Sequence, residues 1–255
     1  MDDRPARRDE REILVIVLAL DTATREGSVA LRSADTLLGW STGDPERPHG
    51  ERLPGELLAL LSVHETDLCE VEIFAVCTGP GSFTGLRVGL ATIQGVALAT
   101  GRPVIAVPTL EALAHAGLEQ LAPQAQRLTL IVPWMDAYRG EVFGAVYRVN
   151  HEGVVTEHHP AAVGTTDVLL QELAPILKAS PVLFVGNAVE GARVAIANTI
   201  GVEAEVQMLE SMPSFAPTVA LIADARGADT AVSPHAIRPV YVRRPYSELP
   251  SGQRK

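Results

Sequence analysis

The feature that most constrains the fold of this chain is an internal repeat. An apolar run that ends at Asp21 is followed by a short turn and an alternating stretch that ends at Arg32, and the same order recurs with Asp136 and Arg148. The two copies read LVIVLALDTATREGSVALR and LTLIVPWMDAYRGEVFGAVYR. Their offset of about 115 residues is too long for a stacked repeat. The repeat therefore predicts two halves, each opening with a strand hairpin.

Both halves continue with alternating strand and helix patterns, so the predicted fold class is α/β. In the first half we expect a helix from about Leu53 to His64, starting near Pro54, and another from Gly85 to Thr100 that Gly101 ends. The fold resembles the duplicated actin-like (ribonuclease H-like) architecture of sugar kinases, in which two acidic turns face a nucleotide cleft. The sequence predicts two subdomains, residues 13–125 and 126–244. They are preceded by a disordered start, residues 1–12, and followed by a flexible tail, residues 245–255.

The balance of charge limits the partners of the chain. A net charge of -10 and a pI near 5.2 give a field that repels phosphate, so we expect no nucleic-acid binding by the chain alone. The two cysteines form no CxxC pair and are expected to be reduced thiols. The apolar run Ile13–Leu20 is far shorter than the ~20 residues of a membrane span. The segment before it mixes acids with bases, unlike a signal peptide. These features predict a cytoplasmic protein without membrane contact.

The stretch GPGSFTGLRVG, residues 79–89, raises the question of a phosphate-binding loop. Gly79, Gly81 and Gly85 are spaced GxGxxxG, which is one residue longer than the dinucleotide-binding fingerprint. The lysine of a Walker A loop is absent. Neither template for binding pyrophosphate fits.

The helix expected after this stretch has two apolar faces. Arg87 and Gln94 are its only strongly polar residues. One face is a stripe of Leu86, Leu90, Ile93 and Ala97, and the second carries small residues, namely Gly85, Gly89, Thr92, Val96 and Ala99. Because small residues let another backbone approach closely, we expect this helix to pack on a second helix, within the chain or in another chain.

Several stretches together resemble the TsaB (YeaZ) family, which belongs to the bacterial machinery for the threonylcarbamoyl modification of adenosine 37 in tRNA. They are GPGSFTGLRVG, PVIAVPTLEALA, ALDTAT, HGERLPGELLALL, MDAYRGEVFGAVY, VGNA and RPVYVR, spread over about residues 13–244. The resemblance implies a non-catalytic scaffold that pairs with the catalytic paralogue TsaD and is joined by the ATPase TsaE. It also implies contact with tRNA only through the complex, and a homodimer when the chain is alone.

The resemblance places the partner interface on the first two helices. Its implied residues are Leu53, Leu57, Leu58, Leu61, Gly85, Leu86, Gly89, Thr92, Val96 and Ala99. On this interpretation, Gly89→Arg or Val96→Arg would leave the fold intact and abolish pairing with TsaD.

The residues present argue against a metalloenzyme like TsaD, a rival class that stoichiometric bound zinc or iron would revive. TsaD carries HHLEGH, with two metal-binding histidines, where this chain has PTLEAL. Thr109 and Leu113 stand in the two ligand positions, and leucine has no donor atom. The seven histidines of the chain show no ligand spacing. We expect no metal site, no catalytic residue and no cofactor of the chain's own.

An ATP-dependent small-molecule kinase of the same fold stays open as an alternative. Asp21 and Asp136 lie at the two turns where such enzymes place carboxylates, although aspartate also readily caps turns. In the second turn Tyr138 and Arg139 would crowd a phosphate. Nucleotide contact is therefore expected only weakly or at the shared interface of the complex, through Asp21, Thr22, Thr24, Gly186 and Asn187.

Overall fold

A computed structural model describes residues 15–121, 128–178, 180–201, 206–209 and 212–242. The predicted disordered start (1–12) and flexible tail (245–255) lie outside these residues. The first sheet has the strand order β3–β2–β1–β4–β5. β1 pairs antiparallel with β2 and parallel with β4. The strands are β1 (Ile16–Asp21), β2 (Ser28–Ser33), β3 (Thr36–Thr42), β4 (Ile73–Cys77) and β5 (Val104–Val107).

The second sheet repeats the first strand for strand, in the order β8–β7–β6–β9–β10. β6 pairs antiparallel with β7 and parallel with β9. The strands are β6 (Leu130–Asp136), β7 (Glu141–Val149), β8 (Val155–Thr165), β9 (Val182–Val185) and β10 (Val206–Leu209). The predicted α/β fold class and its duplication are confirmed. β8 escaped prediction because polar residues and Pro160 interrupt its pattern.

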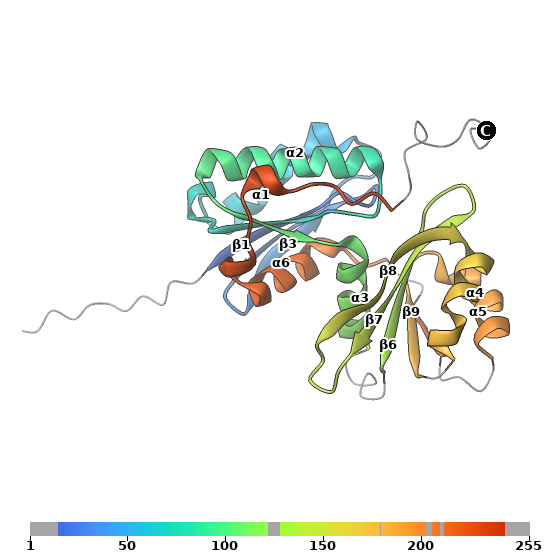
Figure 1. Cartoon of the computed structure of the whole chain (residues 1–255). Helices are drawn as coiled ribbons and strands as arrows, with labels where there is room; N and C mark the ends of the chain where they lie inside the picture. The colour runs from blue at the N-terminus through green and yellow to red at the C-terminus, as the bar shows by residue number, and fades with distance from the viewer. Residues whose placement is uncertain (1–14, 122–127, 179, 202–205, 210–211, 243–255) are drawn as a thin grey trace, which may run out of the picture.

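Six α-helices form three layers around the two sheets within the described residues (Figure 1). α1 and α2 cover the outer face of the first sheet, and α4 and α5 cover the outer face of the second. α3 and α6 lie between the sheets in one continuous core. The helices are α1 (His49–Val63), α2 (Phe83–Thr100), α3 (Thr109–Gln120), α4 (Thr166–Leu177), α5 (Val189–Ile200) and α6 (Phe215–Arg226). Short 3-10 turns occupy Leu68–Glu70, Ala228–Thr230 and Pro234–Ala236.

The packing differs from the predicted division into residues 13–125 and 126–244. α6 comes late in the chain yet packs on β1, β2 and β4 of the first sheet, whereas α3 packs on strands of the second sheet. Arg32 of β2 pairs with Asp224 of α6 at 2.8 Å, and Arg226 of α6 pairs with Glu111 of α3 at 2.6 Å. A boundary between residues 125 and 126 is therefore wrong for these two helices. α6 follows the boundary but packs on the first sheet, and α3 precedes it but packs on the second sheet.

The two outer helices of the first half start earlier than predicted. α1 begins at His49 and contains Pro54, which lacks the N–H that would bond the exposed Gly50 carbonyl. The loss is confined to the first turns of the helix, so the helix tolerates it. Ser82 caps α2 by accepting a hydrogen bond from the Gly85 N–H at 3.2 Å. Gly101 ends α2 in the left-handed conformation, as predicted. Across the described part of the chain, none of the helices has the length and apolarity to cross a membrane.

Candidate functional site

The first turn, at the end of β1, is built around a buried aspartate. Asp21 is 1% exposed, and its two carboxyl oxygens accept hydrogen bonds from the Ala23 N–H at 2.8 Å and the Thr24 hydroxyl at 3.2 Å. Burial raises the pKa of Asp21 from 3.8 to about 6, although hydrogen bonds from Ala23, Thr24 and Cys77 lower it in part. The carboxyl therefore caps its own turn, which was one of the two roles that the sequence left open.

Glycines of the 79–89 motif let α2 lie directly on this turn. A side chain at Gly85 or Gly89 would overlap Thr22, and a side chain at Gly81 would overlap Ala23. Thr22 is fully buried, and its hydroxyl oxygen lies against Gly89. The close backbone approach predicted for α2 thus occurs within the chain. The expectation that Gly89→Arg leaves the fold intact is wrong, because Thr22 already fills the space an arginine would need.

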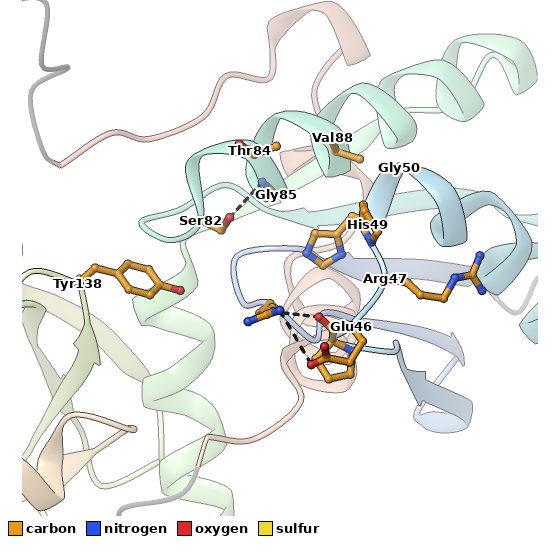
Figure 2. A pocket seen from close by; sticks show the side chains of 12 residues that line it. Glu46, Arg47, His49, Gly50, Ser82, Thr84, Gly85, Val88 and Tyr138 are labelled. Carbon is orange, nitrogen blue, oxygen red and sulfur yellow. Dashed lines mark hydrogen bonds and ion pairs between the residues drawn. The ribbon is translucent and has the colours of Figure 1, made fainter.

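The second turn repeats the hydrogen bonding of the first, but its aspartate is exposed to solvent. Asp136 is exposed, and its carboxylate accepts a hydrogen bond from the Tyr138 N–H at 2.9 Å. The Asn187 side-chain oxygen accepts one from the Asp136 N–H at 2.9 Å. Tyr138 and Arg139 adopt left-handed φ values of 61° and 59°, which strain non-glycine residues. The turn holds the Tyr138 side chain toward the start of α2 (Figure 2).

Three of the five predicted nucleotide contacts are wrong, since a buried residue has no surface to offer a nucleotide. These three are Asp21, Thr22 and Gly186. A side chain at Gly186 would overlap the Trp134 carbonyl. Thr24 is half-buried and Asn187 is exposed, so nucleotide contact by these two stays a prediction.

A cavity of about 400 Å³ lies between the two halves, and none of the five predicted nucleotide contacts lines it. Its walls are the starts of α1 and α2, with Tyr138 from the second half opposite them (Figure 2). Arg25 and Glu46 both line it, and they lie 3.9 Å apart as an exposed ion pair. Arg47 lines the cavity as well, so its charged lining is two arginines and one glutamate, a small excess of positive charge.

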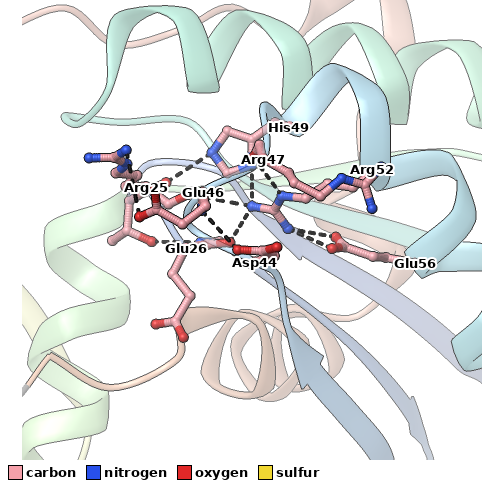
Figure 3. A network of polar contacts seen from close by, with 10 residues as sticks. Arg25, Glu26, Asp44, Glu46, Arg47, His49, Arg52 and Glu56 are labelled. Atoms are coloured by element: carbon pink, nitrogen blue, oxygen red, sulfur yellow. Dashed lines mark hydrogen bonds and ion pairs between the residues drawn. The ribbon is translucent and has the colours of Figure 1, made fainter.

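A network around Arg52 fixes the wall of this cavity (Figure 3). The Arg52 side chain is buried; it donates to both carboxylate oxygens of Glu56 at 2.7 and 2.8 Å and to the backbone carbonyls of Arg25, Glu26 and Arg47. It also donates to Nδ1 of His49, so Nε2 of His49 carries the hydrogen and donates to the Thr24 carbonyl at 3.0 Å. Burial lowers the pKa of His49, in keeping with a neutral ring. The motif HGER is therefore structural, tying α1 to the first turn.

The predicted partner interface is partly wrong. Six of its ten residues are buried inside the chain and cannot line a surface, namely Leu53, Leu57, Leu61, Gly85, Leu86 and Gly89. Leu58 and Ala99 are exposed, and Thr92 and Val96 are half-buried. Both helices do present an outer face, so the location on α1 and α2 stays a prediction.

We define the α1–α2 outer face by its exposed small and apolar residues, Gly55, Leu58, Val63, Ala91, Gly95 and Leu98. Leu58 is 59% and Leu98 is 47% exposed. Among the residues that the structure describes, a Cβ placed at Gly55 or Gly95 would meet no atom within 4 Å outside its chain neighbours and the backbone of its own helix. Sequence reasoning missed five of these six residues. Ala91, Gly95 and Leu98 lie opposite the buried stripe of α2, so the same helical periodicity read from the other side would have found them.

The two polar residues of α2 hold the C-terminal segment of the chain. The Gln94 amide donates to the carbonyls of Pro234 and Ile237 at 2.9 and 3.2 Å. Arg87 donates to the Tyr241 hydroxyl at 2.9 Å, and its guanidinium lies 3.9 Å above the Phe83 ring. These contacts border the α1–α2 outer face on one side.

The positions that hold metal in TsaD have other roles in this structure. The Thr109 hydroxyl accepts a hydrogen bond from the Gly79 N–H at 3.1 Å and so ties α3 to the glycine motif. Leu113 is buried in the core between the sheets. Within the described ranges, no group of three or more His, Cys, Asp or Glu side chains is arranged to hold a metal ion.

Comparisons with known proteins agree with this architecture. A family model described as TsaD, tRNA N6-adenosine threonylcarbamoyltransferase, matches residues 44–212. The tRNA threonylcarbamoyladenosine biosynthesis protein TsaB of Escherichia coli K12 is 36% identical over 138 residues, which are 54% of this chain and 57% of that protein. The aligned part therefore spans less than two thirds of this relative.

Solved structures give the same picture. YeaZ from Pseudomonas aeruginosa has a TM-score of 0.71 at 26% identity, over 89% of this chain and 100% of that chain. The ROK hexokinase of Thermus thermophilus has a TM-score of 0.50 at 16% identity, over 83% and 99% of the two chains, and shares the fold alone. The chain is thus a two-half α/β protein of the actin-like class. Within that class it belongs to the TsaB (YeaZ) family, whose named relatives are assigned to tRNA threonylcarbamoyladenosine biosynthesis.

Proposed function

We propose that this chain is the non-catalytic scaffold of a cytoplasmic assembly that transfers a threonylcarbamoyl group to N6 of adenosine 37 in tRNA. It pairs with TsaD through the α1–α2 outer face, TsaE joins the pair, and tRNA contacts the chain only through the complex. The transfer takes place on TsaD. Alone, the chain closes a homodimer over the same face, because exposed apolar helix surface is unfavourable in water.

One observation carries the proposal: among the described residues, an added Cβ at Gly55 in α1 or Gly95 in α2 would meet no atom within 4 Å outside the backbone of its own helix. Two other helical glycines, Gly50 and Gly191, are equally open, but they lie in the first turns of α1 and α5. Gly85 and Gly89 are required by the contact with Thr22, whereas Gly55 and Gly95 face open space. A glycine inside a helix costs about 1 kcal/mol relative to alanine. Beside Leu58 and Leu98, a side-chain-free position lets a second pair of helices approach to a short interaxial distance.

The absence of a catalytic role rests on how the two turns are used. A kinase of this fold needs an accessible carboxylate beside the transferred phosphate. α2 seals Asp21 in the protein. The exposed Asp136 is followed by Tyr138 and Arg139, whose side chains would crowd a phosphate. Thr109 and Leu113 cannot supply the metal ligands of TsaD. ATP would then meet this subunit only at a shared interface of the complex. ATP turnover by the purified chain alone would favour the alternative, a small-molecule kinase.

The proposal is tested by the affinity of the chain for TsaD from the same genome, measured by calorimetry. Gly95→Arg places a long cation on the face without a clash inside the chain, and we expect binding to weaken about 100-fold or more, a loss of about 2.7 kcal/mol. Val194→Arg is the matched control, because Val194 is an exposed apolar residue on α5, far from this face in sequence. Wild-type affinity of Gly95→Arg with an unchanged melting temperature would show that the partner binds elsewhere.

A further inference from the structure

The outermost strand of the first sheet, β3, is an exposed apolar edge. Its sequence, TLLGWST, contains no charged residue and no proline. Leu37 and Leu38 are exposed, and Trp40, one of two tryptophans in the chain, is 51% exposed. Among the described residues, β3 pairs only with β2, so its other side is open. A strand with one open side presents unpaired N–H and C=O groups at alternate residues.

The duplicated fold contains its own comparison for this edge. β8 holds the equivalent outer place in the second sheet and carries Glu157, His158, His159 and Pro160. Charged residues and proline are the usual means by which outer strands avoid pairing with other chains. β3 has only one such protection, a bulge at Leu38, where the pairing with β2 shifts register. The two halves thus differ at the same structural position, and only the first leaves its edge open to pairing.

We propose that β3 is a docking edge for an extended segment of another protein, which adds to the first sheet as a further strand. Backbone hydrogen bonds along β3 would hold the segment, while Leu37 and Trp40 receive its apolar side chains. Acidic residues flank the edge, Asp35 before β3 and Asp44 after it. The chemistry that fits is therefore a strand with alternating apolar residues and basic residues at its ends.

A second copy of this chain fits the edge less well than a basic segment. Antiparallel pairing of two β3 strands about Gly39 would bring Asp35 of one copy close to Asp44 of the other. The net charge of -10 on each copy adds to the repulsion. The edge and the α1–α2 outer face share no residue, so this inference holds or fails separately from the proposed function.

The test uses the full chain and a fluorescein-labelled probe peptide, Lys-Lys-Val-Thr-Val-Thr-Val-Lys-Lys. We expect saturable binding by fluorescence anisotropy, with a blue shift of tryptophan emission, because Trp40 is exposed and Trp134 is buried. Leu37→Lys adds a charge to the edge and is expected to weaken binding about tenfold or more. Val194→Lys, an exposed apolar position on α5, should bind as the wild type does.

Two further peptides and one sedimentation run complete the test. A peptide with proline in place of the central valine, and a peptide with glutamate in place of every lysine, should each bind about tenfold more weakly or worse. The proposal is overturned by absence of binding at millimolar probe, by equal binding of the proline peptide, or by wild-type affinity of Leu37→Lys. It is also overturned if sedimentation shows a self-association of the chain that Leu37→Lys abolishes, because β3 would then bind a second copy.

Discussion

Replacing the buried Asp21 by asparagine is expected to stabilise this protein at neutral pH. The folded state raises the pKa of Asp21 from 3.8 to about 6, mainly by burial, so it holds this proton more tightly than the unfolded chain does. The stability that the folded protein gains by binding this proton more tightly is fully present below pH ~4 and is lost as the pH rises through about 6. A shift of about two pKa units at about 1.4 kcal/mol per unit makes the loss about 3 kcal/mol at pH ~8.

Asparagine keeps the geometry of the turn without the buried charge. Its side-chain oxygen can accept from the Ala23 N–H, and its amide can donate to the Thr24 hydroxyl. Urea unfolding of Asp21→Asn and wild type between pH ~4 and ~8 measures the difference in unfolding free energy. We expect the variant to gain about 3 kcal/mol relative to wild type across this range.

Asp136→Asn is the matched control, because Asp136 makes the same turn hydrogen bond with its carboxylate in water. Its difference from wild type measures the effect of changing a carboxylate to an amide at an exposed turn. A difference for Asp21→Asn that does not change with pH would refute the reasoning, since it would mean that the Asp21 charge is not desolvated in the folded protein.

Two more predictions concern the packing beneath α2 and α1. Gly89→Ala should lower the free energy of unfolding by about 1–3 kcal/mol, because the added methyl group overlaps Thr22. In a Thr22→Ala background the loss should be less than half as large, which a double-mutant cycle of unfolding free energies would measure. Equal costs in both backgrounds would disprove the contact. Arg52→Ala should cost about 3–5 kcal/mol by thermal or urea unfolding, because it leaves Glu56 and three carbonyls without their donor. Arg52→Lys should recover little of this, since an ammonium lacks the planar fork; full recovery would show that charge alone matters.

The repeated hairpin made the fold predictable from the sequence. The apolar run before each aspartate has the composition of a strand covered on both faces, and the copy at Asp136 fixed the duplication. The sequence could not reveal that α3, from the first half, packs on the second sheet and that α6, from the second half, packs on the first sheet. Both helices have an ordinary stripe of apolar residues. Such a stripe predicts that one face of the helix is buried, but it does not predict which of the two sheets covers that face.

The glycines of α2 show a similar limit for the candidate site. Gly85, Gly89 and Gly95 look alike in the sequence, yet the first two contact Thr22 and the third faces solvent. Small size predicts a close neighbour but does not say whether that neighbour belongs to the same chain. The buried stripe of α2 was predicted correctly because hydrophobic periodicity depends only on the helix itself.

The network at Arg52 was missed for a different reason. An arginine followed by a glutamate four residues later is an ordinary surface pair on a helix. Here the three backbone carbonyls that Arg52 also binds come from loops before α1, and only the tertiary fold brings them to the guanidinium.

The measurement that tests the central claim most directly is threonylcarbamoyl transfer to unmodified tRNA in a reconstituted system. It would contain TsaD, TsaE, threonylcarbamoyl-adenylate and this chain, with the modified nucleoside quantified by mass spectrometry. If the chain contributes an interface and no reacting group, Asp21→Asn should stay within about twofold of wild type. Gly95→Arg at low concentration should lose about 100-fold and recover as its concentration is raised. Loss of transfer in folded Asp21→Asn, or wild-type transfer by Gly95→Arg at low concentration, would contradict the account.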